Sequence, residues 1–205
     1  DVQFKVVGKR RSFSIANAPT GADHLELHIR LVPGGQFTTH VFEKLKEKDI
    51  LRFEGPLGSF RLREDSVRPV ILLAGGTGFA PIKSIVENAI ATGLKRPMTL
   101  YWGSRDLTGL YQFDIARGWE AGLPGFQFVP VLSDAPASDG WTGRSGFAHH
   151  ALMADLPDLS GHEVYACGSP AMIEAARTDL TGRCGLPPEA FLADAFSYSN
   201  DARAA

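Results

Sequence analysis

The sequence contains little cysteine, no long apolar run and almost no net charge. Of its 205 residues, only Cys167 and Cys184 carry thiols, and they form neither a C-x-x-C motif nor a zinc-type spacing. A four-cysteine iron–sulfur cluster therefore cannot be built from this chain, and so few thiols are typical of a reducing, cytoplasmic setting. No apolar run approaches the roughly 18 to 20 residues that cross a bilayer. A net charge of -2 disfavours a nucleic-acid surface, so we expect neither a membrane nor a nucleic acid as partner.

Two different patterns divide the chain. Residues 1 to 66 are β-rich: apolar and polar residues alternate at 2–6 and strictly at 25–31, and 11–15 and 50–54 also read as strands. After the turn at residues 33–35, Thr38 or Thr39 can cap a short helix. This half predicts a partial antiparallel β-barrel.

From Pro69 onward, strands alternate with helices. Strands are expected at 70–74, 98–102, 126–132, 163–167 and 191–195, and helices at 81–92, 111–119, 147–154 and 170–183. This alternation is typical of a parallel sheet with both faces covered. We therefore predict an α+β protein of two domains, 1–66 and 67–205.

A glycine cluster follows the first strand of the second half. The apolar run 70–74 leads into Gly75-Gly76-Thr77-Gly78, and Pro81 stands where a helix would begin. Unpaired N–H groups at a helix start suit a phosphate, although a tight turn would need the same glycines. Neither the Walker pattern nor the dinucleotide fingerprint is matched, because Ile82 precedes Lys83-Ser84 and the third glycine is missing.

The glycine cluster and two further motifs together indicate a protein family. Arg11-Ser12-Phe13-Ser14 is followed by Asn17, the glycine cluster continues to Pro81, and Cys167-Gly168-Ser169-Pro170 is followed by Met172. Together they resemble the ferredoxin–NADP reductase superfamily. The chain is most similar to the branch of CDP-6-deoxy-delta-3,4-glucoseen reductase and the NADH-dependent reductases of bacterial oxygenases.

The resemblance implies an FAD site in the first half. Arg11 would neutralise the flavin phosphates, Phe13 would lie against the isoalloxazine ring, and the Ser14 hydroxyl would hydrogen-bond near flavin N5. The remaining expected contacts are the backbone at His28, Ile29 and Arg30, the turn at Gly34 and Gly35, and Thr38 at a helix start. Thr38 would also be explained as a simple helix cap.

The same resemblance implies a pyridine-nucleotide site in the second half. Thr77 would sit near the nicotinamide, and Cys167 beside its C4 as a positioning residue. The other expected contacts are Gly76, Gly78 and Ala80 near the pyrophosphate, and Gly168 and Met172 in the cysteine motif. Asp194 would place a charge near the nicotinamide, and Phe196 would cover the flavin.

The charged residues that follow two of the predicted strands indicate whether NADH or NADPH binds. NADP-selective relatives carry an arginine after the serine that corresponds to Ser133, whereas this chain carries Asp134. A carboxylate accepts from a ribose hydroxyl and repels a 2'-phosphate, so NADH is favoured over NADPH. Arg105, in the cluster Gly103-Ser104-Arg105, leaves an attraction for phosphate or adenine open.

The implied reaction takes a hydride from NADH to FAD and then passes single electrons to an iron–sulfur carrier of a multicomponent oxygenase or dehydrase system. Any 2Fe-2S cluster would lie on a segment outside this chain or on a partner, and barrel strands are expected before Asp1. An NADH:free-flavin oxidoreductase and a non-catalytic nucleotide-binding module are the alternatives. His149 and His150 fall outside any metal spacing, so we expect them to be surface or helix residues and predict no metal site.

Overall fold

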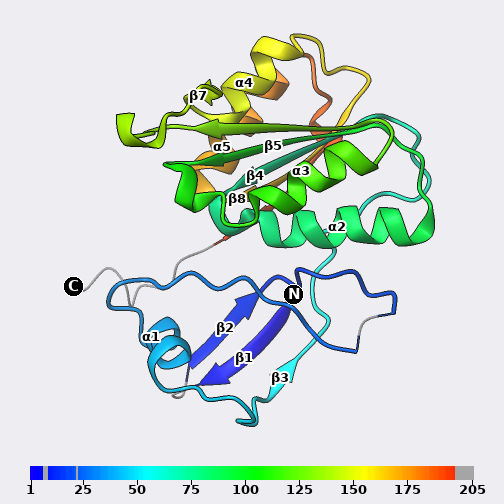
Figure 1. The fold of residues 1–205 in the computed structure, drawn as a ribbon. Helices are drawn as coiled ribbons and strands as arrows, with labels where there is room; N and C mark the ends of the chain where they lie inside the picture. The colour runs from blue at the N-terminus through cyan, green and yellow to red at the C-terminus, as the bar shows by residue number, and fades with distance from the viewer. Residues whose placement is uncertain (7–8, 22, 197–205) are drawn as a thin grey trace.

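The computed structural model describes residues 1–6, 9–21 and 23–196, and in this part the chain forms two sheets (Figure 1). The first is antiparallel, in the order β2-β1-β3, and the second is parallel, in the order β7-β6-β5-β4-β8-β9. The predicted fold class is confirmed. No helix of the described residues is long and apolar enough to span a membrane.

The first sheet is small and open. It consists of β1 (Val2–Val6), β2 (Lys9–Phe13) and β3 (Phe53–Glu54), with α1 (Gln36–Glu43) packed beside it. Phe4 and Phe37 form its buried core with Val2. Three strands do not close into a barrel, and Ile50 remains 89% exposed and Phe53 50% exposed.

Two expectations for this half are wrong. Residues 25–31 form no strand, because Leu27 makes only an isolated bridge to Ile15. Alternating residues extend into a ladder only where another strand edge runs beside them. Helix α1 begins after Gly35, so Thr38 is not its cap; the Thr38 hydroxyl instead lies inside the first turn and donates to the Gly35 carbonyl at 3.2 Å.

The second half follows the predicted alternation closely. All its sheet pairings are parallel, as right-handed βαβ units require. Helix α2 begins two residues before Pro81, and a short 3₁₀ turn, Gly76–Gly78, precedes it. The strands are β4 (Val70–Gly75), β5 (Met98–Ser104), β6 (Phe126–Leu132), β7 (Arg144–Ser145), β8 (Glu163–Gly168) and β9 (Phe191–Ala195), and the helices are α2 (Phe79–Thr92), α3 (Phe113–Gly122), α4 (Ala148–Asp155) and α5 (Pro170–Arg183). Strand β7 was not predicted, since two exposed residues carry no periodic pattern.

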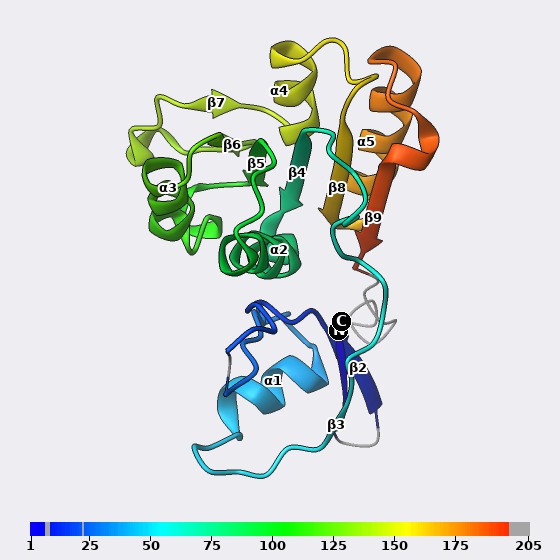
Figure 2. The same ribbon diagram turned by 90° about the vertical axis from the view of Figure 1, so that its right-hand side faces the viewer.

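Helices cover both faces of the parallel sheet (Figure 1). On the face of α2 and α3, Phe79 stacks on Trp102 with ring centroids 3.9 Å apart. Helices α4 and α5 pack on the other face against a second apolar cluster that contains Leu73 and Val164. Figure 2 shows α2 at the side of the sheet that faces the first domain. This helix therefore belongs to both the core and the contact between the domains.

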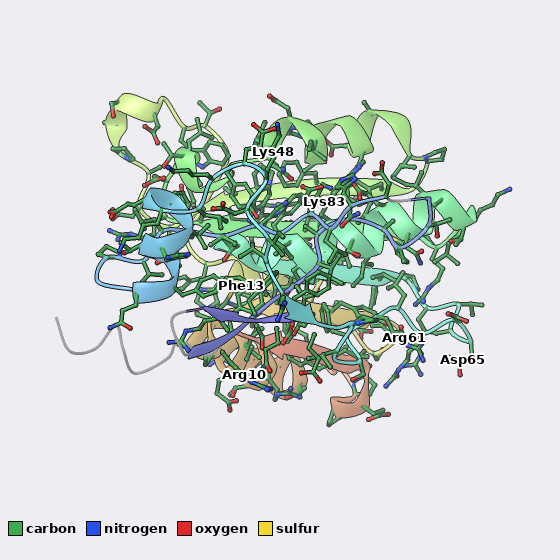
Figure 3. The ribbon with its side chains drawn as sticks, turned by 90° about the horizontal axis from the view of Figure 1, so that it is seen from below. Arg10, Phe13, Lys48, Arg61, Asp65 and Lys83 are labelled. Carbon is green, nitrogen blue, oxygen red and sulfur yellow. The ribbon has the colours of Figure 1, made fainter. Side chains whose placement is uncertain are left out.

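A buried lysine joins the two halves. The side chain of Lys83 on α2 is 5% exposed, and its ammonium lies 2.8 Å from Glu26 of the first half and 2.7 Å from Glu87 one helical turn away (Figure 3). Burial alone would lower the pKa of Lys83, but the hydrogen bonds to Glu26 and Glu87 outweigh burial and raise it. The ammonium also donates to the Ala16 carbonyl at 3.4 Å. Lys83 is thus fully charged and satisfied at neutral pH.

Backbone contacts surround this ion triad. The Ser84 hydroxyl donates to the Asn17 carbonyl at 2.8 Å, and Glu87 accepts from the Ala18 amide at 3.2 Å. The Asn17 side chain in turn accepts from the Glu26 amide at 2.9 Å. Consecutive residues of the first half are therefore anchored to consecutive turns of α2.

The connection between the sheets is fixed by a second buried ion pair. Arg96 lies 2.9 Å from Glu163, and both side chains are at most 5% exposed. The guanidinium also donates to the carbonyls of Arg63 and Arg68 in the connecting segment. At the same point the Tyr165 hydroxyl accepts from the Arg63 amide at 2.9 Å. The connection is therefore held against the amino edge of the sheet.

We expect Lys83→Met to lower the free energy of unfolding by about 3 kcal/mol, since removing one partner of a buried ion pair leaves uncompensated charge. The value is at the low end of the usual range because Glu26 and Glu87 are 31% and 30% exposed. Urea unfolding of the variant measures the change, with Lys95→Met as the control for an exposed lysine. An unfolding free energy equal to that of the control would contradict the role of Lys83.

The same triad predicts a pH dependence. Burial of Glu26 raises its pKa, but the hydrogen bonds from Lys83 and His28 outweigh burial and lower the pKa from 4.5 to about 2. A carboxyl with a lowered folded-state pKa contributes stability that is complete above pH 4.5 and is lost as the pH falls toward 2. Urea unfolding across this window should show a shallower pH dependence in Glu26→Gln than in the unchanged chain. If the free energy of unfolding depends on pH in the same way in both proteins, Glu26 is not the source of the pH dependence.

Candidate functional site

A cavity of about 440 Å³ lies where the first domain meets the carboxyl edge of the parallel sheet. Of the predicted site residues, seven from the first half and four from the second line this cavity. The predicted residues that line the cavity are Arg11, Phe13, Ser14, His28, Arg30, Gly35, Thr38, Thr77, Ala80, Asp194 and Phe196. Arg10 and Phe37 also line it, although the sequence did not single them out. Residues from three distant parts of the chain thus share one cavity.

Aromatic rings and a buried hydroxyl form the first wall. The rings of Phe13 and Phe37 lie 5.0 Å apart at 34°, and Ser14, next along the chain, is 7% exposed. Phe13 ends β2, so the strand delivers its ring and the following hydroxyl to the same space. This wall offers a flat apolar surface beside one small hydrogen-bonding group.

Positive charge and backbone amides form the second wall. Arg10, Arg11 and Arg30 all line the cavity, and one Arg11 guanidinium nitrogen donates to the Arg10 carbonyl at 2.6 Å. Helix α1 starts here with no side-chain cap, and Gly35 to Thr38 reach the cavity. Guanidinium groups beside an uncapped helix start are well suited to phosphate.

His28 connects this wall to the second half. One ring nitrogen lies 2.6 Å from the Tyr111 hydroxyl, and the other lies 2.8 Å from the Glu26 carboxylate that also contacts Lys83. With both nitrogens partnered, the ring is fixed in orientation. The sequence indicated only backbone contacts at position 28. It gave no signal for Glu26, Tyr111 or Lys83, because the contacts Lys83–Glu26 and His28–Tyr111 join residues 57 and 83 positions apart.

The glycine turn lies at the other side of the cavity. Gly76 has a φ of 52°, which favours glycine, and its carbonyl accepts from the Trp102 indole at 3.0 Å. A Cβ atom added at Gly78 would collide with the Cys167 carbonyl. Glycine is therefore required by packing against β8, and Thr77 between them faces the cavity.

The cysteine motif and the last strand complete this edge. Cys167 is completely buried, and burial, followed by the nearby Asp194, raises the pKa of its thiol. It is paired in register with Ala74 on one side and Asp194 on the other. Burial also raises the pKa of Asp194. The Phe196 amide donates to the Gly168 carbonyl at 2.8 Å, which holds this ring at the cavity.

Apart from Ile29 and Gly34 of the first half, the remaining predicted residues lie along the same sheet edge but outside the cavity lining. Met172 packs against Gly75 and Gly168, and the Asp134 amide donates to the Arg105 carbonyl at 2.8 Å. Arg105 also lies 3.4 Å from the Asp134 carboxylate, with both side chains exposed. Those that line no cavity wall are Ile29, Gly34, Gly76, Gly78, Gly103, Ser104, Arg105, Ser133, Asp134, Cys167, Gly168 and Met172.

The edge next to the cavity can take an elongated ligand. The turn at Gly76 to Gly78 follows β4, the Cys167 motif begins at the end of β8, and Arg105 and Asp134 follow β5 and β6. The carboxyl ends of these four parallel strands meet here. Ligands of open parallel sheets bind at this edge. The geometry therefore offers one site for a flat ring and phosphates in the first half and an adjoining one on the sheet.

Comparison with protein families agrees with this division. Residues 1–62 match the oxidoreductase FAD-binding domain, and residues 72–178 match the oxidoreductase NAD-binding domain. The FAD-binding match contains the cavity residues between Asp1 and Thr38, and the NAD-binding match contains Thr77 and Ala80.

Individual relatives were found both by sequence and by structure. The chain is 48% identical over 195 residues to the CDP-6-deoxy-L-threo-D-glycero-4-hexulose-3-dehydrase reductase of Yersinia pestis, covering 95% of this chain and 58% of the relative. It is 40% identical to the terephthalate 1,2-dioxygenase reductase component 1 of Comamonas sp, covering 94% of this chain and 56% of the relative. The Amycolatopsis cytochrome P450 reductase GcoB superposes with a TM-score of 0.88 at 37% identity, covering 96% of this chain and 60% of that one.

The chain thus spans less than two thirds of the length of the curated relatives that it matches. Within that span, the two sheets, the shared cavity and the family matches agree with one another. The chain belongs to the ferredoxin reductase-type family of oxidoreductases and carries its FAD-binding and NAD-binding domains.

Proposed function

We propose that this chain transfers a hydride from NADH to FAD and passes the electrons singly to an iron–sulfur carrier. The observation that carries the proposal is the shared cavity, in which Ser14 of the first half lies with Thr77 and Asp194 of the second. A reaction between two cofactors needs their reacting atoms about 3 to 3.5 Å apart. Residues 1–66 would hold FAD and residues 67–205 would hold NADH.

The residues of the first half fit FAD. Phe13 offers an apolar face to the isoalloxazine, and the buried Ser14 hydroxyl is the hydrogen-bonding group beside it. Arg11, Arg30 and the uncapped start of α1 would take the phosphates. Bound FAD would supply the chemistry of accepting a hydride and releasing electrons one at a time.

The second half would orient the nicotinamide. Thr77 faces the cavity from the glycine turn, and the buried Cys167 stays a neutral thiol because its pKa is raised by burial. A neutral buried thiol positions a ring by packing and does not act as a nucleophile. Phe196 would cover the site and exclude water until the nicotinamide enters.

The relatives indicate the class of acceptor. They are named as reductases of a dehydrase and of a dioxygenase. We propose a 2Fe-2S domain or protein as the immediate partner and a terminal oxygenase or dehydrase behind it, in the cytoplasm.

NADH-dependent reduction of a purified 2Fe-2S ferredoxin tests the proposal. The FAD-loaded chain is mixed with NADH and the ferredoxin without oxygen, and bleaching of the cluster is followed. We expect catalytic reduction of the ferredoxin. Electrons that reach added free flavin but never the ferredoxin would instead indicate a free-flavin oxidoreductase.

Ser14→Ala should slow flavin reduction by about tenfold while FAD stays bound, because loss of one hydrogen bond near the reacting atom corresponds to about 1.4 kcal/mol. Stopped-flow absorbance with excess NADH measures the rate. Ser160→Ala, an exposed serine remote from the cavity, is the control. An unchanged rate in Ser14→Ala would remove the hydroxyl from the mechanism.

Asp134→Arg should shift the preference from NADH toward NADPH. The change removes a carboxylate that repels a 2'-phosphate and frees Arg105 from its 3.4 Å contact, so two guanidinium groups would face that phosphate. We expect kcat/KM for NADPH to rise about tenfold, the equivalent of one charge-assisted hydrogen bond. Asp65→Arg, an exposed reversal on the connecting segment, controls for net charge. Equal gains in both variants would show that Asp134 does not select the nucleotide.

A further inference from the structure

We propose a second ligand site, for a zinc-class divalent cation, formed by His149, His150 and Asp179 on the face of the parallel sheet that α4 and α5 cover. One ligand atom from each of the three side chains lies within 4.8 Å of the others. The two histidines are adjacent at the start of α4, and the carboxylate comes from α5. The site lies on the opposite face of the sheet from α2 and plays no part in the hydride transfer proposed above (Figure 1).

The distances agree with a tetrahedral cation. Asp179 Oδ2 lies 3.4 Å from His149 Nε2 and 3.7 Å from His150 Nε2. Zinc bonds of about 2.0 to 2.2 Å to nitrogen and oxygen place neighbouring ligand atoms about 3.4 Å apart. A small rotation of the exposed His150 ring, 57% accessible, would complete the arrangement.

Burial shows that the cluster is a defined structural feature. His149 is a helix residue, as expected, but its side chain is only 5% exposed. Its Nδ1 is buried and has no hydrogen-bond partner among the described residues. The ring stacks against Phe147 at 13° and lies 4.2 Å from the His150 ring centroid. A buried imidazole with incomplete hydrogen bonding, aimed at a carboxylate and a second imidazole, requires an explanation.

The surrounding groups define the chemistry of the ligand. Two imidazoles and one carboxylate, with no thiolate, suit zinc, nickel or copper better than magnesium or calcium. Arg183 lies 3.5 Å from the other carboxylate oxygen, Oδ1, and so holds Asp179 with Oδ2 facing the histidines.

The same groups limit the affinity. The Arg183 cation repels a metal, and the Nδ1 proton of a ligating His149 would find no acceptor among the described residues. Ligating histidines usually donate that proton, and losing such a partner costs 10- to 100-fold in affinity. We therefore expect micromolar binding, weaker than that of a structural zinc site.

Calorimetric titration of the untagged, chelator-treated chain with ZnCl₂ tests the site. We expect one saturable event, weakened about tenfold or more in Asp179→Asn and in His150→Ala, since losing a ligand costs at least as much as losing its supporting partner. The side chain of His150 is 57% exposed and that of Asp179 is 18% exposed, and circular dichroism checks that each variant folds.

Two further variants serve as controls. His24→Ala removes an exposed histidine that also lies 2.8 Å from an aspartate, Asp23, and Cys184→Ser removes the buried thiol next to Arg183. Both should bind zinc like the unchanged chain. Absence of saturable binding, or binding that survives Asp179→Asn and His150→Ala, would overturn the proposal, as would equal loss in His24→Ala.

Discussion

The ammonium of Lys83, held between Glu26 and Glu87, is the interaction on which the arrangement of the two domains depends. Hydride transfer tolerates little error in the distance between the reacting atoms, and the residues that line the cavity come from two domains, each with its own sheet. Without a fixed contact, such domains would move relative to one another. A buried ion triad supported by Ser84, Asn17 and Ala18 fixes this contact at the helix whose start forms the nucleotide turn.

The triad also reaches the cavity itself. Glu26 binds Lys83 with one oxygen and His28 with the other, and His28 lines the cavity and contacts Tyr111. The group that joins the domains is thus one hydrogen bond away from a residue that lines the cavity. Domain contact and site geometry therefore depend on the same few side chains.

Much of the second half could be predicted from the sequence because its signals are local. Strands β6 and β9 and helix α5 have the predicted bounds, since apolar runs, glycine turns and a proline at the helix start coincide there. The prediction of a strand at residues 25–31 was wrong, because the alternation of apolar and polar residues carries no information about whether a neighbouring strand edge exists.

The candidate site shows the same difference between residues with a local sequence signal and residues whose contacts form only in the fold. Short motifs in the sequence singled out Phe13, Ser14, Thr77 and Asp194, and the structure brings these four residues to one cavity. Lys83, by contrast, is in sequence one of two charged residues of α2, with Glu87, and its role emerges only when Glu26, 57 positions away, folds against it. His149 is a parallel case, because burial against α5 turns an ordinary helix residue into a candidate ligand.

The most direct measurement is an anaerobic titration of the FAD-reconstituted chain with NADH, following the oxidised-flavin absorbance. We expect a stoichiometric amount of NADH to bleach the flavin, because residues of both domains line one cavity. Flavin that binds to the chain and yet stays oxidised in excess NADH would contradict hydride transfer by this chain.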